Sequence, residues 1–161
     1  MKTKELVTIA ILAALLYIVQ VAFSFLPNIE LVSLLVLVYT LVFDKMTLKI
    51  IAVFIILEGV QWGFGLWWWS YIYVWPILYF VVRWLKKFIR IDDSISWAVV
   101  LGFYGLFFGM LFSLAYILIS PSYAFTYWVS GILFDVIHCI GNFCLCLIAY
   151  KPLYAILKRF R

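Results

Sequence analysis

The stretch from Leu48 to Leu57 reads LKIIAVFIIL and contains a single charged residue, Lys49. Its apolar residues form a continuous run, whereas a strand of a membrane β-barrel would alternate them with polar residues. Similar runs follow one another along the whole chain, which is 69% hydrophobic and 12% charged. This composition excludes an ordinary soluble domain. The continuous runs instead indicate helices that cross a membrane.

Six hydrophobic segments of this kind are predicted to form helices. Because a spanning helix needs about 20 residues, six of them occupy most of the 161 residues and leave only short loops. We therefore expect residues 1–161 to form a single all-α integral membrane domain, with six transmembrane helices in one compact bundle. The predicted helices are Glu5–Leu26, Ile29–Phe43, Leu48–Phe64, Trp68–Leu85, Ser96–Ile119 and Tyr127–Tyr150. The second is short for a full span, so we expect it to tilt, to have the bilayer thinned around it, or to be sheltered by its neighbours.

The positive charges all fall on one side of the membrane when the six segments are threaded back and forth. The opposite connections, around residues 27–30, 63–70 and 120–126, contain no Lys or Arg. Excess Lys and Arg stay cytoplasmic in proteins with short loops, so both termini are predicted to be cytoplasmic. The net charge of +5 is attributed to this orientation and to anionic lipid, and not to nucleic acid. The cations are Lys2, Lys4, Lys45, Lys49, Arg83, Lys86, Lys87, Arg90, Lys151, Lys158, Arg159 and Arg161.

The third predicted helix carries an acidic residue, Glu58, in its outer half. Gln61, Trp62 and Gly65 fall within about 100° of Glu58 on a helix of 3.6 residues per turn. Ionisable groups inside a membrane are costly and usually face a cavity or a partner. We therefore expect Glu58 to belong to a binding site, with a structural hydrogen bond as the alternative.

The sixth predicted helix has a polar face made of Trp128, Gly131, Asp135, His138 and Asn142. These residues lie within about 80° of one another. Because polar residues are costly on a lipid-facing surface, this face is predicted to point into the bundle, where its upper part could meet the Glu58 face. His138 could instead join helices through hydrogen bonds to Asp135 or Asn142. Packing is the expected role of Asn142.

Residues 63–75 read GFGLWWWSYIYVW and form a dense aromatic cluster. Interfacial aromatic belts explain part of it. Successive helical residues point about 100° apart, however, so these side chains cannot all face lipid. The ones that face inward are predicted to stack on a planar ligand or to hold a cation. Candidates from this cluster are Trp67, Trp68, Trp69 and Tyr71.

The chain lacks the sequence motifs that would indicate an enzyme. It has no GxxxxGK[ST] phosphate-binding loop, and no HExxH, GxSxG or paired-cysteine metal motif. An intramembrane enzyme would need a nucleophile with a base, or a metal cluster. We therefore expect a non-enzymatic protein that uses neither a metal nor a cofactor of its own.

The first predicted helix contains TIAILAALLY at residues 8–17, with Ala10 and Ala14 one turn apart. In a small six-helix protein with basic inner loops, this pattern resembles the substrate-binding S-component of energy-coupling factor (ECF) vitamin transporters. The LPNIEL entry to the second helix, at residues 26–31, is similar to that family. So is the end of the polar sixth helix in Lys151-Pro152-Leu153. The resemblance covers the topology and length of essentially the whole chain.

The resemblance implies that the chain captures a vitamin or its precursor outside a bacterial or archaeal cell membrane. It implies partners as well: a membrane scaffold subunit, which Ala10 and Ala14 would contact, and two cytoplasmic ATPases that would hydrolyse ATP. The aromatic residues and acids suggest a planar heteroaromatic ligand: thiamin or its pyrimidine precursor, a B6 vitamer, a cobalamin fragment or riboflavin. By location, the expected ligand-binding residues are Glu58, Gln61, Trp62, Trp67, Trp68, Trp69, Tyr71, Trp128, Asp135 and His138.

A structural protein is the alternative, in the form of a small polytopic scaffold of the MreD (rod-shape) type that binds no ligand. That alternative treats Glu58 and His138 as links between helices. It gives no reason for the many aromatic residues on the outer side. A channel is less favoured, because no ring of like charges is visible in the sequence.

Overall fold

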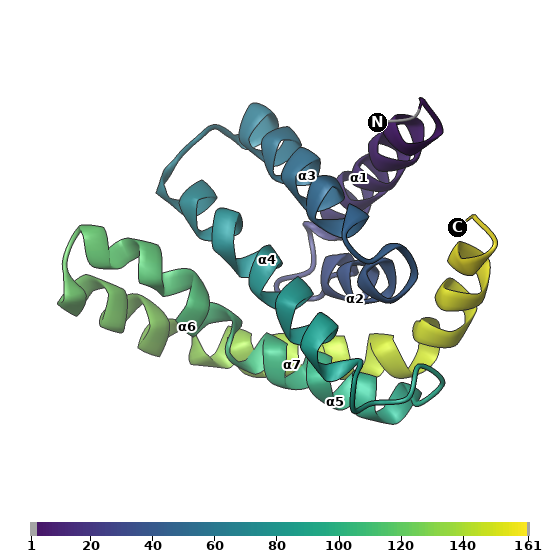
Figure 1. Ribbon diagram of the computed structural model, residues 1–161. Coiled ribbons are helices and arrows are strands. Elements are labelled where there is room, and N and C mark those ends of the chain that lie inside the picture. The colour runs from purple at the N-terminus through teal and green to yellow at the C-terminus, as the bar shows by residue number, and fades with distance from the viewer. Residues whose placement is uncertain (1–2, 161) are drawn as a thin grey trace.

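The computed structural model describes residues 3–160, and this part of the chain is all-α and contains no strand (Figure 1). Lys2 and Arg161, two of the predicted cytoplasmic cations, lie outside the described residues. The all-α prediction is therefore confirmed. The elements are α1 (Thr3–Phe23), α2 (Val32–Phe43), α3 (Met46–Trp62), α4 (Leu66–Leu85), α5 (Ser94–Leu106), α6 (Phe108–Ser113), the 3₁₀-helix η1 (Leu114–Leu118) and α7 (Pro121–Lys158).

The short helix α2 is the centre of the fold. Every residue from Val32 to Val42 is buried, and α1, α3, α4 and α7 all pack against it. A helix that is apolar on all sides is stable when protein surrounds it completely. The expectation that neighbours shelter the short second helix is confirmed.

The segment predicted as one helix from Ser96 to Ile119 is broken at Phe107, and α5 meets the α6–η1 segment at 41°. In a continuous helix the backbone N–H of Gly109 would bond to the carbonyl of Gly105. It donates instead to Oδ1 of Asp135 in α7, at 2.8 Å. A side chain 26 residues away thus supplies the hydrogen bond that the break removes.

Helix α7 begins six residues earlier than predicted, so residues 121–126 are helical and do not form a loop. The hydroxyl of Ser120 accepts a hydrogen bond from the backbone N–H of Tyr123 at 3.0 Å, and Pro121 follows it. A serine cap followed by proline is a strong signal for a helix start. The helix also continues through Pro152 to Lys158, and Figure 1 shows its C-terminal part turned away from the rest.

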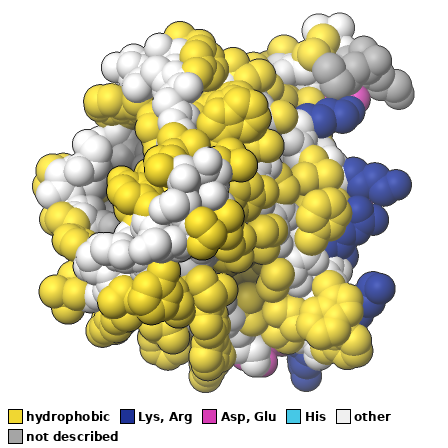
Figure 2. Space-filling view, turned by 90° about the vertical axis from the view of Figure 1, so that its left-hand side faces the viewer, with side chains coloured by type: hydrophobic (Ala, Val, Ile, Leu, Met, Phe, Trp, Pro, Cys, Tyr) yellow, Lys and Arg dark blue, Asp and Glu magenta, His cyan; other side chains and the backbone are white. Residues whose placement is uncertain are grey.

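Two of the described helices, α1 and α7, are long and apolar enough to cross a membrane. The bent pair of α5 with α6–η1 makes a third candidate when it is counted as one span. Figure 2 shows an exterior covered largely by hydrophobic side chains, with Lys and Arg gathered along one edge. Leu118 and Ile148, for example, are 80% and 76% exposed. Such an apolar exterior is typical of a protein surrounded by lipid.

Asp44, in the turn between α2 and α3, pairs with two cations at the end of α4. Its Oδ1 accepts a hydrogen bond from Nζ of Lys86 at 2.8 Å, and Nε of Arg83 lies 3.7 Å away. The Lys86 ammonium holds the pKa of Asp44 below its usual value. Lys86 and Arg83, at the end of α4, are thereby tied to the α2–α3 turn.

The glycine spacing in α5 predicts close helix packing, and α7 packs along that face. A Cβ added at Gly105 would lie 2.8 Å from the backbone carbon and oxygen of His138. We expect Gly105→Ala to destabilise the protein by about 1–3 kcal/mol, because the backbone of α7 must move. The decrease in the midpoint of thermal unfolding in detergent measures this loss of stability. A Cβ at Gly102 would meet atoms only at 3.5 Å, so Gly102→Ala should leave the midpoint unchanged, and equal midpoints for both variants would contradict the packing.

Candidate functional site

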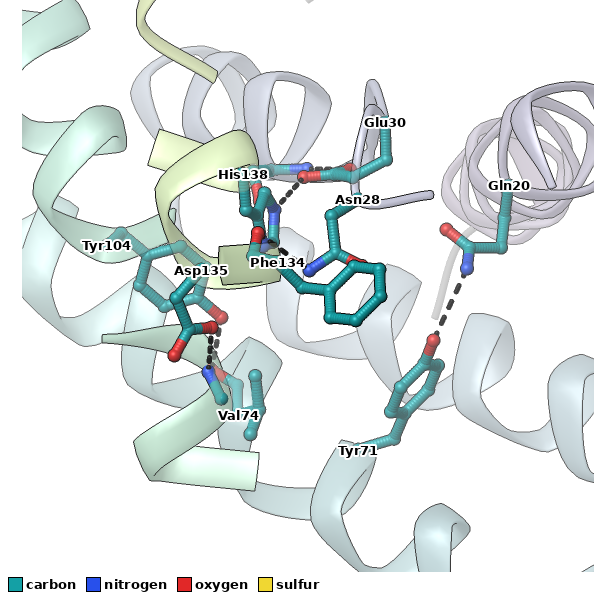
Figure 3. A network of polar contacts seen from close by, with 11 residues as sticks. Gln20, Asn28, Glu30, Tyr71, Val74, Tyr104, Phe134, Asp135 and His138 are labelled. Atoms are coloured by element: carbon teal, nitrogen blue, oxygen red, sulfur yellow. Dashed lines mark hydrogen bonds and ion pairs between the residues drawn. The ribbon is translucent and has the colours of Figure 1, made fainter. Parts of the chain in front are cut away.

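The connection between α1 and α2 lies across α7 and places Glu30 beside His138 (Figure 3). Oε1 of Glu30 lies 3.1 Å from Nε2 of His138, and Oε2 accepts the backbone N–H of Ser33 at 2.8 Å. Both side chains are largely buried, at 12% and 3% exposed. One carboxylate therefore joins α7 to the first turn of α2.

His138 bonds to neither Asp135 nor Asn142, although the sequence suggested both as partners. Glu30 was not among the predicted site residues. It is, however, the one acidic residue in the three connections predicted to face outward. A single acid in otherwise uncharged connections could have indicated a role for Glu30 in the site. The structure also confirms that Asp135, His138 and Asn142 face inward, since each is 2–3% exposed.

A central cavity of about 320 Å³ opens beside this pair. It lies at the ends of the helices opposite the cations: Gln20 lines it near the end of α1, whose first turn carries Lys4. Figure 3 shows that Gln20 donates to the hydroxyl of Tyr71, at 3.3 Å, and that Asn28 donates to the Phe134 carbonyl, at 3.1 Å. These bonds attach the α1–α2 connection and the end of α1 to α4 and α7. The residues with polar side-chain atoms that line this cavity include Gln20, Asn28, Glu30, Tyr71, Trp75 and His138.

Two buried polar atoms of the central cavity have no hydrogen-bond partner among the described residues. They are Nδ1 of His138 and the indole Nε1 of Trp75. Both rings contact Phe108, whose centroid lies 4.8 Å from that of His138 and 5.7 Å from that of Trp75. The indole is a hydrogen-bond donor, and Nδ1 is an acceptor when Nε2 carries the proton toward Glu30. The residues that line the cavity thus include one with an unpaired donor and one with an unpaired acceptor, and the rings of both contact Phe108.

A second cavity of about 450 Å³ adjoins the first, with Asn28 and Phe108 lining both. We call it the Asp135 cavity; Trp128 and Gly131 also line it. Asp135 uses Oδ1 to hold Gly109, while its buried Oδ2 has no partner among the described residues. Trp128, Gly131 and Asp135 of the face predicted on the sixth helix therefore line a cavity next to the one that His138 lines.

Glu58 lines a third and smaller cavity of about 220 Å³, which we call the Glu58 chamber. The predicted meeting of Glu58 with Asp135 and His138 does not occur within one cavity, because α4 lies between and places Tyr71 there. Of the face predicted around Glu58, only Trp62 lines the same cavity; Gln61 is exposed, and Gly65 lies beyond the end of α3. The chamber is lined by Gln20, Val21, Ser24, Glu58, Trp62, Trp67 and Tyr71.

Three predicted site residues line none of these three cavities. Gln61 is exposed, and Trp69 is 54% exposed, as expected for residues at a membrane surface. The indole of Trp68 donates to the carbonyl of Ile55 at 2.8 Å and so joins α4 to α3. The aromatic residues of this region therefore have different roles. Trp62 and, from the cluster, Trp67 and Tyr71 line a cavity, whereas Trp68 joins α3 to α4.

Within residues 3–160, no three His, Cys, Asp or Glu side chains lie close enough together to hold a metal ion. What the cavities offer is hydrogen bonding, ring stacking and negative charge. No family profile matches this chain, and neither does any curated protein or solved structure.

Proposed function

We propose that this chain is the substrate-capture subunit of an ECF-type importer, with six membrane spans and both termini in the cytoplasm. In this arrangement the bent α5–η1 pair forms one span and the sheltered α2 another. All cations of the described residues fall at the connections assigned to one side, which supports the orientation. The central cavity and the Asp135 cavity then open toward the outside of the cell.

The unpartnered buried atoms of His138 and Trp75 carry this proposal. A buried polar group without a hydrogen bond costs about 1–3 kcal/mol, and proteins retain such groups where they serve a purpose. A ligand that accepts from the indole and donates to the imidazole would offset both costs. The cavity volume is at the lower end of small-molecule sites, about 300–1,000 Å³. A planar heteroaromatic vitamin or precursor, with thiamin or its pyrimidine part as the first candidates, has the required ring and both kinds of group.

The scaffold alternative accounts for the Glu30–His138 link, since it is a contact between elements. It gives no partner to Trp75 or Asp135, whose polar atoms remain unpaired in a protein without a ligand. The capture proposal therefore explains more of the buried polar atoms.

The direct test is a titration of the purified chain with a panel of B vitamins and their precursors. Tryptophan fluorescence serves as the readout of binding. The chain contains eight Trp, and Trp75 borders the central cavity. Saturable quenching by one compound, at submicromolar concentration, is the expected result. If no compound of the panel changes the fluorescence of the folded protein, the proposed ligand class is wrong.

The outer face of α1 is the proposed contact with the scaffold subunit, because Ala10 is exposed and Ala14 is half-buried there. Small side chains let a second helix approach closely. Replacing both by Trp is expected to abolish copurification with coexpressed scaffold and ATPase subunits, while ligand affinity stays unchanged. Ala22→Trp, at another exposed position of α1, is the control and should copurify normally. Loss of ligand affinity in the double variant would contradict the assignment of this face.

A further inference from the structure

The Glu58 chamber plays no part in the proposed capture site. Glu58 is 2% exposed, and its Oε1 has no partner among the described residues. None of the residues that line the chamber is Lys, Arg or His. A buried carboxylate of this kind calls for a counter-charge or a hydrogen-bond donor from outside the chain.

The walls of the chamber suit a positive charge. Three aromatic residues line the chamber together with Glu58: Trp62, from the end of α3, and Trp67 and Tyr71, from the first turns of α4. The rings of Trp67 and Tyr71 meet edge to face, with centroids 5.3 Å apart. Aromatic faces attract cations, and an alkylated ammonium ion is the cation that such cages hold best. Carboxylate and aromatic faces together favour an organic cation over a metal ion, which would seek several oxygen ligands.

The chamber is a neighbour of the central cavity, and Glu58 lines only the chamber. Gln20, Ser24 and Tyr71 line both, and Gln20 donates a hydrogen bond to the Tyr71 hydroxyl at this shared boundary. Trp62 is 56% exposed, so the chamber opens at the perimeter of the bundle between α1, α3 and α4. This position gives access both to solutes at the membrane surface and to lipid headgroups.

We propose that the Glu58 chamber is a second binding site, specific for an organic ammonium group, with Glu58 as the counter-ion and Trp62, Trp67 and Tyr71 as the cage. The ammonium group belongs either to a free amine or to an amine-bearing phospholipid. This proposal does not depend on the identity of the ligand in the central cavity.

The test compares choline with 3,3-dimethylbutan-1-ol, which has the same shape but carries no charge. Binding to the full chain in phosphatidylglycerol nanodiscs, which contain no amine lipid, is followed by calorimetry and tryptophan fluorescence. We expect choline to bind saturably and the uncharged analogue at least tenfold more weakly. Glu58→Gln keeps the size of the side chain and should weaken choline binding at least tenfold, whereas Glu5→Gln, at the exposed Lys49 pair, should not.

A second arm distinguishes the two sources of the ammonium group. Adding phosphatidylethanolamine or phosphatidylcholine to the nanodiscs should displace choline if the site takes lipid headgroups, and should have no effect if it takes free amines. Trp67→Leu provides an independent variant and should also weaken choline binding. Equal binding of choline and its uncharged analogue, unchanged binding by Glu58→Gln, or absence of any choline binding would overturn the proposal.

Discussion

Glu30→Ala is expected to destabilise the protein by about 3–5 kcal/mol and to weaken ligand binding at least a hundredfold. Removing one partner of a buried pair leaves the other buried and unpaired, which accounts for the loss of stability. The carboxylate also holds Ser33 at the start of α2, so the α1–α2 connection loses both of its attachments at this point. His138 is then free to turn away from the central cavity. Thermal unfolding and ligand titration of the same preparation measure the two effects.

The matched control is Glu5→Ala. Glu5 also forms an ion pair, with Nζ of Lys49 at 2.7 Å, but the two side chains are 33% and 53% exposed. Exposed pairs of this kind contribute about 0–1 kcal/mol, so this variant should unfold and bind almost as the native chain does. Equal behaviour of the two variants would show that the Glu30–His138 pair does not organise the site.

The second large effect concerns Asp135, whose two oxygens have different roles. Asp135→Asn retains an oxygen to accept the Gly109 N–H and replaces only the unpartnered Oδ2. We expect the unfolding midpoint to change little and ligand affinity to fall about 10- to 100-fold, since hydrogen bonds to charged groups contribute about 1.5–3 kcal/mol.

Asp135→Ala separates the structural role from the binding role. It removes the acceptor for Gly109 at the break between α5 and α6, so it should lower stability as well as affinity. Full affinity in Asp135→Asn would exclude Oδ2 from the ligand site, and full stability in Asp135→Ala would contradict the explanation of the break.

The parts of the fold that periodicity controls were predictable from the sequence. The polar face of α7 was placed inward from its spacing alone, because polar side chains are costly in lipid, and its buried residues confirm this. The shelter of α2 was one of the alternatives that followed from its short length, and its buried residues show that this alternative holds. In both cases a local pattern determines the environment of the residue.

The rest depended on contacts between distant parts of the chain. The break at Phe107 arises because a side chain in α7 takes the N–H of Gly109, and no pattern within α5 shows this. Glu30 sits in a connection, where no helical period indicates direction, so its bond to His138 depends on how that connection crosses α7. The start of α7 is different: Ser120-Pro121 is a recognisable cap, although residues 120–126 were predicted to form a connection.

The most direct measurement is mass spectrometry of small molecules released from the purified chain after expression in cells that are rich in vitamins. A capture site that gives partners to otherwise unpaired polar atoms should retain its ligand through purification. The account predicts one compound in stoichiometric amount from the native chain, with a ring and at least one hydrogen-bond donor and one acceptor, and little of it from Glu30→Ala. Equal amounts from the two proteins, or none from the native chain, would contradict it.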